Sequence, residues 1–211
     1  MIDAAILPLQ RRLMQTPAEA LAKRGVRADH ITLVGLVIGL AAAGAAALGL
    51  FALALLGLLL NRLADGLDGA VARATRRTDL GGYFDIAADF AFYGAVPLAF
   101  VLHDPAANGS AGAFLLASFY INGTTFLGYA VLAEKHKLET RAQGLKNVYF
   151  SAGLLEGTET IAFFVLLCLW PAGFAPLAWI FGALCLLTAG QRVRLAALLF
   201  SRDGHARDRH N

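Results

Sequence analysis

The sequence predicts an all-α integral membrane protein with six transmembrane helices, an amphipathic juxtamembrane segment before them, and both termini in the cytoplasm. Three observations support this fold class. Of the 211 residues, 58% are hydrophobic, whereas soluble domains rarely exceed about half. Residues 31–61 and 90–102 contain no charged side chain. The 18 lysines and arginines are absent from every second connection between the expected helices.

Residues 1–29 are expected to form the amphipathic segment on the cytoplasmic surface. Apolar residues there alternate with five basic ones, Arg11, Arg12, Lys23, Arg24 and Arg27. Such a segment suits the surface of an anionic bilayer, although a partly ordered tail explains the composition equally well. We expect Pro8 and Pro17 to interrupt it. Residues 1–29 contain no long apolar run, so a signal peptide is not expected.

The membrane domain is expected over residues 30–200. A span needs about 20 residues, so the uncharged run 31–61 is too long for one helix and too short for two. The second helix must therefore continue into the polar residues that follow. With turns at Gly49, at 103–109 and at 171–176, the expected helices cover about 30–49, 52–74, 80–102, 110–134, 148–170 and 177–200.

The orientation of the membrane domain is predicted from its basic residues. Connections near residue 50, at 103–109 and at 171–176 contain no lysine or arginine, whereas the opposite connections and both ends of the chain do. The positive-inside rule then places both termini, and the charged tail 201–211, in the cytoplasm. Cys168 and Cys185 lie in apolar runs, so no disulfide framework is expected.

Four aspartates interrupt this apolar chain. Asp65 and Asp68 are three residues apart, and Asp85 and Asp89 are four apart, so each pair shares one helix face. An aspartate in the bilayer centre costs roughly 2.5–3.5 kcal/mol, and four facing lipid would cost about 10 kcal/mol. They must face a wet cavity or be neutralised by cations. Oxygen ligands favour Mg²⁺, Mn²⁺ or Ca²⁺, and two divalent ions would balance four carboxylates.

The spacing of these aspartates resembles a family signature. The pattern reads Asp65-x-x-Asp68-Gly69-x-x-Ala72-Arg73, followed by Gly81-x-x-x-Asp85-x-x-x-Asp89. It closely resembles that of the CDP-alcohol phosphotransferases, integral membrane enzymes that build phospholipid headgroups. One departure is the spacer of seven residues before Gly81, where the family more often has eight.

The resemblance implies roles for the carboxylates. Asp65, Asp68 and Asp85 would be metal ligands. Asp89 would bind the second of two Mg²⁺ or Mn²⁺ ions and act as the catalytic base toward the acceptor. A carboxylate cluster that only binds ions or bridges helices is the alternative.

The resemblance also implies a nucleotide site. Gly69 and Ala72 would leave room for the cytidine and its ribose, and Arg73 would pair with phosphate or with the carboxylates. Gly81 belongs to the same signature. Thr32 is the retained residue of a Pro-Asn-x-x-Thr segment that often precedes the first helix. It is assigned to the nucleotide, with a helix N-cap as the alternative.

Residues for the acceptor are less specific. Glu156 and Glu159 lie in an apolar helix, where they bind acceptor hydroxyls or pair with Arg62 or Arg192. Arg62 itself is expected either to support the carboxylates together with Asn61 or to snorkel to the interface. The candidates for binding an acceptor phosphate are Arg141, Lys146 and Arg192, and contact with lipid headgroups is the alternative.

The resulting hypothesis is an enzyme of the cytoplasmic membrane whose active site faces the cytoplasm. It would transfer a phosphatidyl group from CDP-diacylglycerol to a small polar hydroxyl acceptor such as glycerol 3-phosphate, releasing CMP. Alternatives are CDP-choline or CDP-ethanolamine as donor with diacylglycerol as acceptor, an intramembrane prenyltransferase, and a divalent-cation transporter. We expect membrane lipids and a second copy of the chain as partners, and no nucleic acid.

Overall fold

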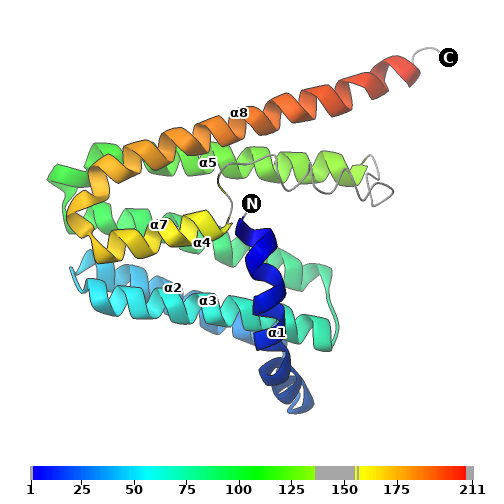
Figure 1. Ribbon diagram of the computed structural model, residues 1–211, viewed down its shortest axis with the longest axis horizontal. Helices are drawn as coiled ribbons and strands as arrows, with labels where there is room; N and C mark the ends of the chain where they lie inside the picture. Colours follow the sequence, from blue (N-terminus) through cyan, green and yellow to red (C-terminus); the bar gives the residue numbers. More distant parts are fainter. Residues whose placement is uncertain (1, 136–154, 156, 208–211) are drawn as a thin grey trace.

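The computed structural model describes residues 2–135, 155 and 157–207, with side chains placed from residue 13 to residue 200 of these. This described part contains no β-strand (Figure 1). Its helices are α1 (Ile2–Lys23), α2 (Ala28–Ala47), α3 (Phe51–Ala74), α4 (Asp79–His103), α5 (Pro105–Lys135), α7 (Gly157–Leu169), the 3₁₀ turn η1 (Pro171–Gly173) and α8 (Phe174–Arg207). The prediction of an all-helical protein is confirmed.

The helices form an antiparallel stack. Figure 1 shows α5 beside α8 on one side and α2 beside α3 on the other, with α4 and α7 between them and α1 crossing α3. Phe51 at the start of α3 stacks on Phe100 near the end of α4 at 5.6 Å, and Phe174 at the start of α8 stacks on Phe100 at 5.2 Å. The connections without basic residues therefore meet at one end of the stack.

Helix α4 is the centre of the apolar core. Phe92 and Phe100 on α4 are buried against Phe164 of α7 and Phe174 of α8. The rings of Phe92 and Phe164 meet edge to face, with centroids 5.9 Å apart, a favourable geometry for aromatic pairs. This packing fixes α4, and with it the aspartates near its first turns.

Small residues bring α2 against α3. At Gly39 a Cβ would lie 2.8 Å from Phe92 Cδ2 and 2.9 Å from Asn61 Nδ2, so no larger residue fits. At Gly57 a Cβ would lie 2.7 Å from that of Ala42. Close approach through glycine and alanine is typical of helix packing in membranes. It places the start of α2 beside the polar end of α3.

The first helix differs from expectation. Helix α1 runs unbroken through Pro8 and Pro17, so the predicted interruptions are wrong. A proline removes one helical hydrogen bond, and contacts with α3 offset this loss for α1. Ala18 is 1% exposed and packs with Ala70 and Val71 of α3.

The predicted loop 103–109 is also wrong, because α5 begins at Pro105. Asp104 Oδ1 accepts a hydrogen bond from Ala107 N–H at 3.0 Å, which caps the helix, and proline is favoured at the first helical position. Asn108 Nδ2 donates to Phe100 O at 2.8 Å. The residues that suggested a loop are instead the cap and the anchor of the helix.

Four described helices are long and apolar enough to cross a membrane: Ala28–Ala47, Asp79–His103, Pro105–Lys135 and Pro171–Phe200. Helix α3 carries Arg62, Asp65 and Asp68 in its second half, which lowers its hydropathy. The described part of α7 has 13 residues, and most of 148–156 lies outside the described residues. Helix α8 continues to Arg207, into the segment expected as a tail.

Candidate active site

Three of the four aspartates converge where α3 and α4 face each other. One carboxylate oxygen from each of Asp65, Asp85 and Asp89 lies within 4.8 Å of the others. These residues and Asp68 line an open cavity together with Thr32 and Gly35 of α2. The two pairs predicted from their spacing thus line one cavity, although Asp68 is not among the three converging carboxylates.

The converging oxygens fit a divalent cation of the hard class. Octahedral Mg²⁺ binds oxygen at about 2.0–2.1 Å, which places opposite ligands about 4.2 Å apart. The three oxygens lie within 4.8 Å of one another, so small side-chain rotations would suffice to reach such a geometry. An oxygen-only donor set suits Mg²⁺ or Mn²⁺ better than zinc or copper.

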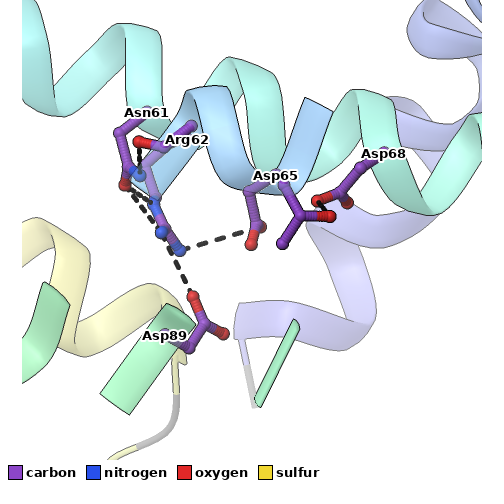
Figure 2. Close-up of polar contacts among 7 residues, drawn as sticks. Asn61, Arg62, Asp65, Asp68 and Asp89 are labelled. Carbon is purple, nitrogen blue, oxygen red and sulfur yellow. Dashed lines mark hydrogen bonds and ion pairs between the residues drawn. The ribbon is translucent and has the colours of Figure 1, made fainter. Parts of the chain in front are cut away.

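Figure 2 shows Asp68 on the side of Asp65 away from Arg62 and Asp89. It is 5% exposed, and its Oδ2 accepts a hydrogen bond from Thr32 Oγ1 at 2.7 Å. Thr32 lies inside α2, whose N-cap position is Arg27, so the N-cap alternative for Thr32 is wrong. The hydroxyl instead orients the carboxylate of Asp68.

Replacing Thr32 with valine should lower the free energy of unfolding by about 1.5–3 kcal/mol, the usual range for a hydrogen bond to a charged group. The buried Asp68 carboxylate loses this donor while the side-chain volume is kept. Thermal unfolding in detergent with EDTA present measures the change. Thr32→Ser should recover most of it. Thr124→Val, which removes an exposed hydroxyl bonded to its own helix, should have little effect. Equal stability of Thr32→Val and wild type would contradict this role.

Arg62 points into the cluster rather than toward the membrane interface, so the snorkelling alternative is wrong. Its Nη2 lies 3.2 Å from Asp89 Oδ1 and its Nη1 lies 3.6 Å from Asp65 Oδ2 (Figure 2). Asn61 Oδ1 accepts from Arg62 Nε at 2.9 Å and from Nη2 at 2.7 Å. The guanidinium is therefore held between two of the three converging carboxylates.

Of the residues assigned to the nucleotide, Thr32 lines this cavity, whereas the others are placed only by their positions on α3 and α4. At Gly69, which follows Asp68, a Cβ would meet only Arg73 Nη1 at 3.3 Å, the mobile end of a long side chain. Ala72 is partly exposed on the same helix. Gly81 lies in the first turn of α4. Its N–H donates to Oγ1 of the N-cap residue Thr78 at 3.0 Å, and a Cβ at Gly81 would lie 3.1 Å from Asp29 Oδ1.

Of the acceptor candidates, the structure describes two. Arg192 on α8 donates through Nη1 to Asn122 Oδ1 at 2.9 Å and to Thr125 Oγ1 at 3.1 Å, so it is built into the α5–α8 contact. Glu159 is partly buried in the first turn of α7. Arg141, Lys146 and Glu156 lie outside the described residues. Asn122 was missed from the sequence, although an amide inside an apolar helix was a usable signal.

The comparison with family models is decisive for the class of protein. The model for CDP-alcohol phosphatidyltransferase matches residues 26–201, from the start of α2 to the end of the apolar part of α8. The chain belongs to the CDP-alcohol phosphatidyltransferase family. It is therefore a membrane transferase of phospholipid biosynthesis, and the prenyltransferase and transporter alternatives are excluded.

The similarity of this CDP-alcohol phosphatidyltransferase to known proteins covers most of its chain. It is 48% identical to inner membrane protein YnjF of Escherichia coli (strain K12) over 193 residues, covering 92% of this chain and 94% of that protein. It resembles Mycobacterium tuberculosis phosphatidylinositol phosphate synthase (PgsA1) with CDP-DAG bound, at a TM-score of 0.69 and 20% identity, over 88% and 94% of the two chains. The complex of PgsA1 with manganese and citrate gives a TM-score of 0.61 at 20% identity, over 86% and 87%.

Proposed function

We propose that the chain transfers a phosphatidyl group from CDP-diacylglycerol to a hydroxyl acceptor and releases CMP. The convergence of Asp65, Asp85 and Asp89 within 4.8 Å, at positions of the family signature, carries this proposal. The fold shared with a synthase crystallised with CDP-DAG supports the choice of donor. CDP-choline or CDP-ethanolamine with diacylglycerol as acceptor is the competing pair of substrates.

The carboxylates have two tasks in this reaction. Asp65, Asp68 and Asp85 would hold divalent ions, and Asp89 would contact the second of two. When bound, Mg²⁺ or Mn²⁺ would neutralise charge on the diphosphate oxygens and stabilise the departing CMP.

Asp89 is also the proposed base. The acceptor oxygen forms a bond to the phosphorus that carries diacylglycerol, and the bond from that phosphorus to the CMP oxygen breaks. Asp89 takes the proton of the acceptor hydroxyl. Its carboxylate is aimed by Arg62, whose Nη2 lies 3.2 Å from Asp89 Oδ1.

The nucleotide is proposed to lie over the exposed side of α3. Gly69 and Ala72 leave space beside Asp68, Arg73 supplies positive charge for a phosphate, and Thr32 closes the α2 side. Gly81 acts indirectly in this arrangement, by setting the start of α4.

Replacing Gly69 with leucine should abolish binding of CDP-diacylglycerol and leave the fold intact. A Cβ at Gly69 meets only the flexible end of Arg73, so the added side chain enters the proposed nucleotide space rather than the core. Binding is measured in detergent with radiolabelled CDP-diacylglycerol. Gly128→Leu is the matched control, because Gly128 is exposed on α5 and nothing lies near it. Unchanged donor affinity in Gly69→Leu would remove this pocket.

The acceptor is proposed to be a small polar alcohol, with glycerol 3-phosphate first. Arg192 is fixed on α8 by Asn122 and Thr125 of α5, and such a held cation suits a phosphate. Arg141, Lys146, Glu156 and Glu159 are proposed to complete the acceptor site.

The antiparallel stack supports a proposed membrane arrangement. We propose six spans, with α3 and α7 added to the four long apolar helices, and both termini in the cytoplasm. The starts of α2 and α4 and the end of α3 share one end of the stack, as the Thr32–Asp68 hydrogen bond and the approach of Asp29 to Gly81 indicate. Basic residues cluster there, so this end, with the active site, would face the cytoplasm. A homodimer in the cytoplasmic membrane is proposed.

An acceptor screen tests the proposed substrates. Purified protein in detergent is mixed with CDP-diacylglycerol, Mg²⁺ and one alcohol at a time, and CMP release is measured. Glycerol 3-phosphate should give more CMP than unphosphorylated alcohols of similar size. CMP release that requires CDP-choline and diacylglycerol would favour the competing substrate pair instead.

A further inference from the structure

Arg62 is held by several contacts beside the active site. Asn61 Oδ1 accepts two of its hydrogen bonds, at 2.9 and 2.7 Å, and Asn61 Nδ2 in turn donates to Gly35 O of α2 at 2.8 Å. The guanidinium carbon lies 5.0 Å from the centre of the Phe92 ring, a cation–π distance. Its side chain is only 18% exposed. The backbone of α2 and the core of α4 thus fix the position of this charge.

Arg62 contacts the same carboxylates that are the candidate metal ligands. Asp65 and Asp89, the two carboxylates that Arg62 contacts at 3.6 and 3.2 Å, are also two of the three that converge. A guanidinium so placed neutralises the carboxylates that a divalent ion would otherwise neutralise.

We propose that Arg62 is a built-in counter-cation that takes the place of one divalent ion while no donor is bound. Without donor, the four aspartates then hold one divalent ion. The second ion enters together with the diphosphate of the CDP-lipid. This inference rests on the proposed two-ion reaction and adds an order of binding to it.

Formal charges support this order. Four ionised carboxylates and one guanidinium leave three negative charges in the cavity. One divalent ion leaves one negative charge, whereas a second would make the cavity positive. The diphosphate of the donor brings about two further negative charges, and with them a second ion leaves the cavity close to neutral.

The number of bound Mn²⁺ ions tests the inference. Purified protein in detergent is titrated with Mn²⁺, and free Mn²⁺ is followed by electron paramagnetic resonance. Wild type should bind one ion without donor and two with CDP-diacylglycerol present and no acceptor. Arg62→Met should bind two ions without donor. Arg76→Met, which removes the same charge from the exposed α3–α4 connection, should bind one.

Two results would overturn the proposal: two ions bound to wild type without donor, or one ion bound to a folded Arg62→Met protein. The wild-type titration can overturn the proposal even if Arg62→Met does not fold. CMP release separates this inference from the proposed function. Transfer by a wild type that binds two ions without donor would retain the function and reject the role of Arg62. If wild type binds one ion without donor and two with donor, but releases no CMP with any acceptor, the role of Arg62 would be retained and the proposed function rejected.

Discussion

Replacing Asp89 with asparagine is expected to slow phosphatidyl transfer by about 10²–10⁴-fold, the usual loss when a general base is removed, while CDP-diacylglycerol still binds. Asparagine keeps the size and one acceptor oxygen of aspartate. The contact of Asp89 Oδ1 with Arg62 Nη2, at 3.2 Å, is therefore retained and α4 packs as before. The amide cannot take the proton of the acceptor hydroxyl.

The measurement pairs CMP release with binding of labelled CDP-diacylglycerol for each variant. Asp65→Asn should weaken metal and donor binding as well as transfer, because Asp65 contacts both Arg62 and the converging carboxylates. Asp79→Asn is the control, since Asp79 is exposed at the first position of α4. If Asp89→Asn loses donor binding as completely as Asp65→Asn, the aspartates are equivalent ligands and the base lies elsewhere.

Removal of divalent metal is expected to abolish transfer. Without a bound ion, three net negative charges from the aspartates and Arg62 face the negative diphosphate of the donor, which repels it from the cavity. Activity is measured after dialysis against EDTA and again after adding Mg²⁺ or Mn²⁺, either of which should restore it. Full turnover in EDTA would show that the carboxylates work without metal.

The helices should survive this treatment. The core of α4 consists of Phe92 and Phe100 packed against α7 and α8, and it needs no ion. Circular dichroism should therefore show the same helical signal with and without EDTA, which separates loss of metal from loss of fold.

Apolar runs allowed most helix positions to be predicted from the sequence. The helix expected over 80–102 is Asp79–His103, and the one expected over 52–74 is Phe51–Ala74. The loop expected at 103–109 was wrong because the side chain of Asn108 has its partner at Phe100 O. Such a contact, between the first turn of α5 and the last turn of α4, leaves no periodic pattern in the sequence.

The site was predictable to the extent that it depends on spacing within one helix. Asp65 with Asp68, and Asp85 with Asp89, are paired by helical periodicity. The contact of Thr32 with Asp68 depends instead on how closely α2 approaches α3, which Gly39 permits. The direction of Arg62 depends likewise on Asn61 and Phe92, because a long side chain can reach either the interface or the cluster.

The position of the transferred phosphorus tests the central proposal most directly. CDP-diacylglycerol is labelled with ³²P in the phosphate that carries diacylglycerol, then incubated with purified protein, Mg²⁺ and glycerol 3-phosphate. Phosphatidyl transfer predicts that all label appears in a new phospholipid and that the released CMP is unlabelled. The reaction should stop in EDTA. Label in the released nucleotide would contradict the proposal. So would folded protein that produces no CMP with this or any other acceptor.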